Sequence, residues 1–140
     1  MQLFKLFVLT FVYAFVLDMV WLALIAQSIY AESIGTLLRK SGSSMMPNWP
    51  AAMLVYVAIV TGILCFVLPK AGGNYALAFA WGALFGAVTY GIFDFTNFSI
   101  LAHWPLKITI IDFIWGMVLC GLTSLFANFI QQWLSKPPYQ

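Results

Sequence analysis

Three aspartates stand among apolar residues, where a carboxylate is costly. Asp18, Asp94 and Asp112 each lie inside or at the edge of a hydrophobic stretch. A charge at membrane depth costs at least ~2.5 to 3.5 kcal/mol on insertion scales, so such side chains pair, take up a proton or line a wet cavity. Carboxyl groups placed in this way can bind a cation or a proton, or serve as general acid and base. These three residues are therefore the first candidates for chemistry.

The composition shows which elements must position them. Of the 140 residues, 64% are hydrophobic and only 7% are charged, whereas soluble domains carry about a quarter charged residues. A hydrocarbon core of about 30 Å takes roughly 20 helical residues to cross. Four apolar stretches are long enough, at residues 3–25, 49–68, 75–98 and 106–129. We therefore predict one transmembrane domain over residues 1–140, an all-α integral membrane four-helix bundle in contact with the lipid bilayer.

The connections contain turn-forming or charged residues. Residues 31–48 are predicted to form an extramembrane loop, and residues 69–74 and 99–105 to form short turns. Tyr and Trp residues gather near the ends of the segments, as in an aromatic belt. The basic residues divide equally between the two ends of the bundle: Lys5, Lys70 and Lys136 on one side, and Arg39, Lys40 and Lys107 on the other. The positive-inside rule therefore leaves the orientation open.

Helix length places the three aspartates in depth. At 1.5 Å per residue, Asp18 lies about 20 Å beyond Lys5, and Asp94 lies roughly 28 Å beyond Tyr75. Asp112 lies about 10 Å into the fourth segment, which enters from the side where the third segment ends. Because successive crossings are antiparallel, all three carboxyl groups are expected in one leaflet.

Four-residue spacing predicts which helix faces they share. Small or polar residues recur at this spacing in three segments: Thr10, Ala14 and Asp18; Ala78, Gly82, Gly86, Tyr90 and Asp94; and Asp112, Gly116, Cys120, Ser124 and Asn128. Small residues at this spacing let helices approach closely in lipid. The aspartates are therefore expected between helices and not against acyl chains.

The polar residues around these carboxyl groups form the expected ligand site. They are Asp18, Trp21, Tyr90, Asp94, Asn97, Lys107, Asp112 and Trp115. Three like charges close together cannot all stay ionised cheaply, so at least one should carry a proton unless Lys107 or a bound cation compensates. A structural role is the alternative, in which an aspartate hydrogen-bonded to Tyr, Asn or Trp fastens helices together.

Several chemistries are excluded. The single histidine, His103, rules out histidine boxes and bis-histidine haem sites. The sequence has no Gly-rich phosphate loop and no Cys-x-x-Cys motif, so we predict no cofactor and no metal site. The scattered basic residues indicate no nucleic-acid partner.

The segment from Tyr90 to Gly116 carries a recognisable signature. Its features are Tyr90, Asp94, Thr96 and Asn97, then Trp104, Pro105, Leu106 and Thr109, then Asp112, Trp115 and Gly116. Together with Asp18, Trp21, Asn48 and Trp49, they make the chain resemble a family of small four-helix bacterial membrane proteins of unknown function. The resemblance implies a bacterial inner-membrane location and the four-helix architecture, but no activity.

Three functions remain open. The first is binding or transport of a proton, a cation or an amphiphilic small molecule or lipid at the carboxylate cluster, in which so short a chain would need a second copy, a homodimer, to enclose a path. The second is a lipid-active enzyme that uses one aspartate as base and another as acid, or two to hold Mg²⁺. The third is an accessory subunit of a membrane complex. Whether the protein is an enzyme is left undecided.

Overall fold

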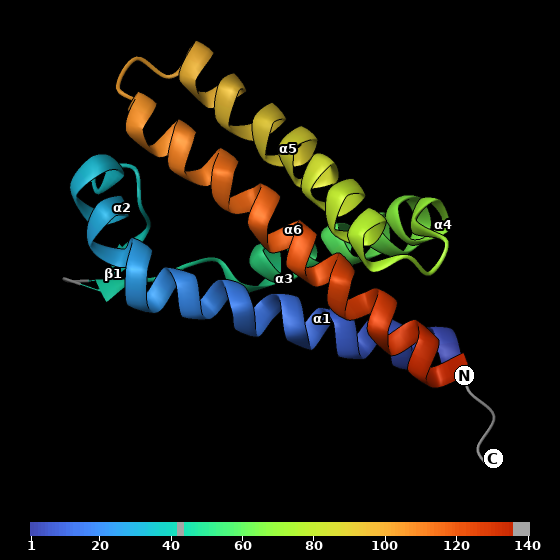
Figure 1. Ribbon diagram of the computed structural model, residues 1–140. Helices are drawn as coiled ribbons and strands as arrows, with labels where there is room; N and C mark the ends of the chain where they lie inside the picture. Colours follow the sequence, from blue (N-terminus) through green and yellow to red (C-terminus); the bar gives the residue numbers. More distant parts are fainter. Residues whose placement is uncertain (42–43, 136–140) are drawn as a thin grey trace.

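Four long helical segments dominate the molecule. The computed structural model describes residues 1–41 and 44–135. Its four segments are each long and apolar enough to cross a membrane: Gln2–Ile34, Trp49–Ala71, Tyr75–Ile100 and Leu106–Ser135. The predicted four-helix membrane bundle is therefore confirmed (Figure 1).

Two of the segments are divided by short π-helical turns. The first consists of α1 (Gln2–Trp21), η1 (Leu22–Ala26) and α2 (Gln27–Ile34), and the second of α3 (Trp49–Gly62), η2 (Ile63–Val67) and α4 (Leu68–Ala71). The other two segments are single helices, α5 (Tyr75–Ile100) and α6 (Leu106–Ser135). Between α2 and α3, strands β1 (Lys40–Ser41) and β2 (Ser44–Met45) pair antiparallel, with Lys40 opposite Met45.

Two helices extend past their predicted ends. The first segment stays helical to Ile34 and not only to residue 25, so the predicted loop over 31–48 is wrong for its first residues. Its last residues are more polar but include neither Gly nor Pro before Gly35, so the helix leaves the apolar stretch without a break. Helix α6 likewise continues to Ser135, past residue 129.

Local chemistry explains the other helix ends. The side chains of Asn48 and Asn74 cap α3 and α5 by accepting hydrogen bonds from Ala51 N (3.3 Å) and Leu77 N (3.0 Å). Gly72 and Gly73 have φ of 55° and 83°, which lets α4 and α5 meet in a tight turn.

The π-helical turn η2 lies directly before a proline. Pro69 has no N–H to donate to the carbonyl of Cys65, and its ring crowds that carbonyl. The helix accommodates the lost bond by widening over Ile63–Val67, since a π-turn is one of the recognised ways in which a helix bends at such a site. The second segment can therefore change direction before it ends at Gly72.

Helix α6 is the central element of the bundle. It runs antiparallel to α5 on one side and packs against α1 on the other, while α3 packs on α1 (Figure 1). Gln2 Nε2 donates to Leu134 O at 3.2 Å, so the start of α1 lies beside the end of α6. The amides of Asn128 and Gln132 donate to Gly73 O at 3.1 and 2.8 Å. The turn between α4 and α5 therefore lies at that same end.

The two small-residue faces of α5 and α6 meet each other. A Cβ atom added to Gly82 would lie 2.6 Å from Cys120 O, and one added to Gly86 would collide with Gly116 O. A Cβ atom on Gly116 would collide with the ring of Tyr90. The helices are thus in backbone contact, and the antiparallel register brings the polar ends of both faces, with Asp94 and Asp112, to the same end of the bundle.

Candidate functional site

Asp18 is held between three helices. It lies on the buried face of α1 with Leu6, Thr10 and Ala14, one residue per turn. Its Oδ2 accepts a hydrogen bond from Tyr56 Oη on α3 at 2.6 Å, and its Oδ1 accepts one from Trp115 Nε1 on α6 at 2.7 Å. Both carboxylate oxygens therefore have a side-chain donor, and these contacts tie α1 to α3 and α6.

Tyr56 is a site residue that the sequence analysis missed. Its side chain is buried, and the rings of Phe11 and Phe15 pack edge-on against it with centroids 6.1 and 5.3 Å away. A signal was present in its depth. Tyr56 follows Trp49 by seven residues, about 10 Å into the second segment, which enters the membrane from the side where the first segment leaves it. A hydroxyl at that depth lies at the level predicted for Asp18.

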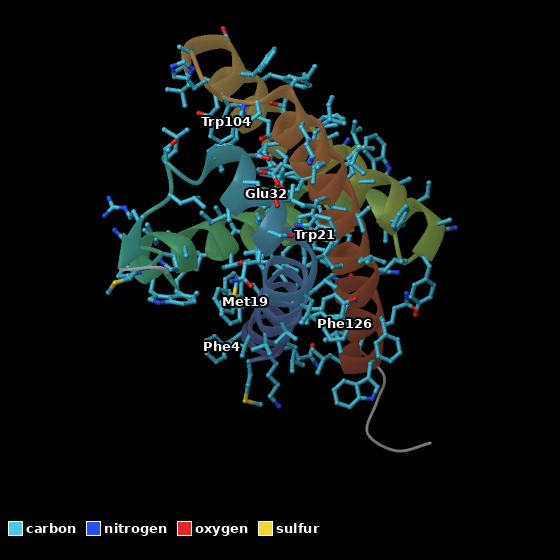
Figure 2. All side chains as sticks on the ribbon, turned by 90° about the vertical axis from the view of Figure 1, so that its left-hand side faces the viewer. Phe4, Met19, Trp21, Glu32, Trp104 and Phe126 are labelled. Atoms are coloured by element: carbon cyan, nitrogen blue, oxygen red, sulfur yellow. The ribbon has the colours of Figure 1, made fainter. Side chains whose placement is uncertain are left out.

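Two predicted tryptophans stack beside Asp18. The rings of Trp21 and Trp115 are 4.3 Å apart between centroids and inclined by 8°. Trp21 and Phe126 both lie at the boundary of α1 and α6 (Figure 2), where the ring of Phe126 stacks on Tyr13 at 4.2 Å. The indole N–H of Trp21 is buried without a hydrogen-bond partner among the described residues.

Asp112 joins the same region from α6. It is buried, and its carboxyl group is close enough to Asp18 for the two to interact electrostatically. The two donors to Asp18, Tyr56 and Trp115, are neutral. Neither of them therefore offsets a second negative charge at Asp112. The structure thus brings Asp18 and Asp112 together, with the Trp21 and Trp115 rings beside them.

Asp94 has a different environment. Its side chain is fully buried, and neither carboxylate oxygen has a hydrogen-bond partner in the described part of the chain. Tyr90, one turn earlier on α5, is close enough to interact electrostatically with both Asp94 and Asp18. Among the candidate site residues, Tyr90 is therefore one that lies near both carboxyl groups.

The remaining predicted residues lie at the edge. Asn97 is half-buried, one turn beyond Asp94. Lys107 is exposed, and it does not hydrogen-bond to Asp94, whose oxygens have no partner among the described residues. In the first turn of α6, which follows the short loop after α5, Lys107 is exposed while Ile108 and Thr109 are buried in the bundle.

An apolar groove lies beside Tyr90. It has a volume of about 420 Å³ between α3 and α5. Its lining consists of Val55, Ala58, Ile59, Phe85, Thr89, Tyr90 and Phe93. The hydroxyl of Thr89 donates to Phe85 O at 3.0 Å, so it is already satisfied within α5. The groove is therefore apolar except at Tyr90, and the sequence analysis did not predict it.

Among the residues that the structure describes, the candidate site does not contain the set of ligands that a metal ion needs. Within residues 1–41 and 44–135, no three His, Cys, Asp or Glu side chains come close enough together to hold a metal ion. The arrangement is instead a cluster of carboxyl, phenol and indole groups next to an apolar groove. Such a site suits hydrogen bonding and the binding of a ligand with one polar end.

The fold defines a four-helix integral membrane protein, and three of its aspartates are buried. The chain belongs to the family described as predicted membrane protein (DUF2177), which matches residues 3–129. No curated protein and no solved structure matches it. The family resemblance seen in the sequence is therefore confirmed, and it concerns a membrane family of unknown function.

Proposed function

We propose that the protein binds a membrane amphiphile, with the apolar chain in the groove between α3 and α5 and the polar end toward the carboxyl cluster. The observation that carries this proposal is the groove itself. Its volume of about 420 Å³ falls in the range of roughly 300 to 1,000 Å³ typical of small-molecule sites, which are mostly apolar with a few convergent polar groups. Here Tyr90 is the polar group that lines the groove.

The direction of the groove suits a molecule that lies in one leaflet. Phe85 is ten residues beyond Tyr75, about 15 Å along α5 and so near the middle of a hydrocarbon core of about 30 Å. Phe93 is about 12 Å further along the same helix. The groove therefore runs from mid-membrane toward the membrane surface and reaches the level of Asp94. A lipid-like ligand in the groove would therefore have its chain at mid-membrane and its polar end near the membrane surface.

Binding could serve transport, in line with the first function expected from the sequence. A carboxyl group at the level of the groove's end would then receive a proton or a cationic group as the ligand enters or leaves. In this proposal the protein acts in a bacterial inner membrane. A second copy of the chain would complete the path, because four helices alone leave the groove open on one side.

One observation favours the accessory or structural role as a second candidate. Both oxygens of Asp18 are hydrogen-bonded to side chains of neighbouring helices, which is the arrangement expected of an aspartate that fastens a bundle. A structural role explains the hydrogen bonds of Asp18, but it explains neither the groove nor the unpartnered oxygens of Asp94. Binding of an amphiphile would explain the groove and Asp94.

The proposal is tested by filling the groove. In proteoliposomes, a dodecyl alcohol that carries a photoreactive diazirine should label residues of the groove. Val55→Phe should reduce that labelling several-fold, because Val55 lines the groove. Val57→Phe is the matched control, since Val57 is an exposed valine of the same helix that is 40% exposed and does not line the groove. Equal labelling in the wild type and both variants, or labelling spread evenly over all helices, would contradict the proposal.

A further inference from the structure

The carboxyl group of Asp94 lacks any partner that the described chain could supply. It has no exposed area, and both of its oxygens are without a hydrogen bond. Burying a polar group in this way costs free energy, and buried carboxyl groups in folded proteins nearly always have a donor. The contrast with Asp18, which has a donor for each oxygen, shows that the bundle can satisfy an aspartate where the role is structural.

Asp94 directly follows a residue of the groove in α5, although it does not itself line the groove. Tyr90 and Phe93, which precede it by four residues and by one on α5, both line the groove. Phe93 is 55% exposed, and its ring packs edge-on against Trp104 with centroids 5.9 Å apart. Trp104 lies at the end of the α5 and α6 hairpin (Figure 2). In the arrangement proposed below, Phe93 would turn aside to let a ligand of the groove reach Asp94.

The groups around this end of the groove favour a positive charge. A carboxylate attracts an ammonium group, and the faces of Tyr90, Phe93 and Trp104 attract it as well, since aromatic rings bind quaternary ammonium ions through their negative faces. An anionic group would instead be repelled by the carboxyl cluster, and the nearby cation, Lys107, faces outward. The indole N–H of Trp104 is buried and unpartnered, so it does not occupy Asp94.

We infer that the ligand of the groove is an ammonium-bearing amphiphile and that Asp94 accepts its headgroup. This inference rests on the proposed function and adds the chemical class of the ligand. The chain would lie between α3 and α5, the ammonium group would pass Phe93, and the carboxylate of Asp94 would gain the partner that it lacks within the chain. Asp18 would remain a structural contact, and Asp112 would belong with Asp18.

The experiment compares probes that share one alkyl chain and differ in their headgroups. Proteoliposomes are labelled with diazirine-bearing dodecyl probes that end in trimethylammonium, in hydroxyl or in carboxylate, and the labelled peptides are identified by mass spectrometry. We expect the trimethylammonium probe to label the groove about tenfold more efficiently than the hydroxyl probe, the factor that corresponds to about 1.4 kcal/mol. The carboxylate probe should label it least.

Two variants locate the charge that is responsible. Asp94→Asn should bring the trimethylammonium probe down to the level of the hydroxyl probe while leaving the hydroxyl probe unchanged. Asp112→Asn, the matched control at the second buried carboxyl group, should preserve the tenfold preference. The inference fails if the wild type labels equally with all headgroups, as it would if Asp94 simply carried a proton, or if Asp112→Asn removes the preference.

The outcome for the neutral probe separates the two proposals. Labelling of the groove by the hydroxyl probe without any headgroup preference would leave the proposed function intact and overturn only the inference about Asp94. Failure of every probe to label the groove would overturn both. A change in oligomeric state on Val55→Phe, with no labelling by any probe, would show that a second copy of the chain fills the groove in place of an amphiphile.

Discussion

Removing the Asp18 contacts should loosen the bundle by a measurable amount. Asp18 accepts two hydrogen bonds, from Tyr56 Oη at 2.6 Å and from Trp115 Nε1 at 2.7 Å, and these join α1 to α3 and α6. Hydrogen bonds between transmembrane side chains contribute about 0.6 kcal/mol on average and at most about 1.7. Two of them, made to a carboxylate at short distance, should together contribute about 1 to 3 kcal/mol.

The two contacts can be separated by choice of variant. Asp18→Ala removes both and should lower the free energy of unfolding by about 1 to 3 kcal/mol, since it also leaves Tyr56 and Trp115 without an acceptor. Tyr56→Phe removes one and should cost about half as much. Because the variants share one bond, their effects should not add. The double variant should show a coupling energy of about 0.6 to 1.7 kcal/mol in a double-mutant cycle.

The assay is reversible unfolding in mixed micelles, followed by tryptophan fluorescence and checked by circular dichroism. Tyr13→Phe is the matched control, because it removes a hydroxyl from a tyrosine of α1 whose contact is a ring stack on Phe126. This variant should leave the midpoint unchanged. Additive effects of Asp18→Ala and Tyr56→Phe, or equal effects of Tyr13→Phe and Tyr56→Phe, would refute the idea that Asp18 fastens the helices.

The remaining predictions concern the α5 and α6 interface, the topology and the turn between α4 and α5. Gly86→Leu should lower the free energy of unfolding by about 1 to 3 kcal/mol or more, because a side chain there meets the backbone of Gly116. In the same detergent unfolding assay, Ala80→Leu on the exposed face of α5 should have little effect. Reporter fusions at Gly73 and at the C-terminus should report the same compartment, because the end of α6 binds the carbonyl of Gly73; opposite compartments would contradict four crossings. Gly72→Ala should cost about 1 to 2 kcal/mol, since its φ of 55° lies in the left-handed region, and an unchanged melting temperature would mean that the turn adapts.

Much of the fold follows from the sequence because lipid imposes simple rules. A helix must satisfy its own backbone in the membrane, so four apolar stretches of sufficient length become four crossings. The faces were equally readable, since Gly82 and Gly86 on α5, and Gly116 with Cys120 on α6, stand at four-residue spacing and do lie in the helix contact. What was missed lies outside this rule. Residues 26–34 are too polar to be counted as a span, yet nothing ends the helix before Gly35.

The candidate site was readable in part, for a related reason. Depth and helix face depend on residue number alone, so they placed Asp18, Asp94 and Asp112 on buried surfaces. Partner choice depends on how helices cross, and that is set by packing between residues distant in the sequence. The bond from Tyr56 to Asp18 and the groove between α3 and α5 both arise from such crossings. No local pattern indicates the groove, and the depth of Tyr56 indicates its level in the membrane but not its bond to Asp18.

Asp18 and Asp94 differ in the hydrogen-bond partners that their surroundings supply. Asp18 faces a crossing where a phenol and an indole reach it, so its oxygens are satisfied. Asp94 lies on the buried face of α5 that also carries Gly82 and Gly86, and neither of its oxygens has a hydrogen-bond partner among the described residues. In our proposal, Asp18 stabilises the bundle through its two hydrogen bonds, and Asp94, whose oxygens have no partner among the described residues, is the carboxyl group that meets a ligand.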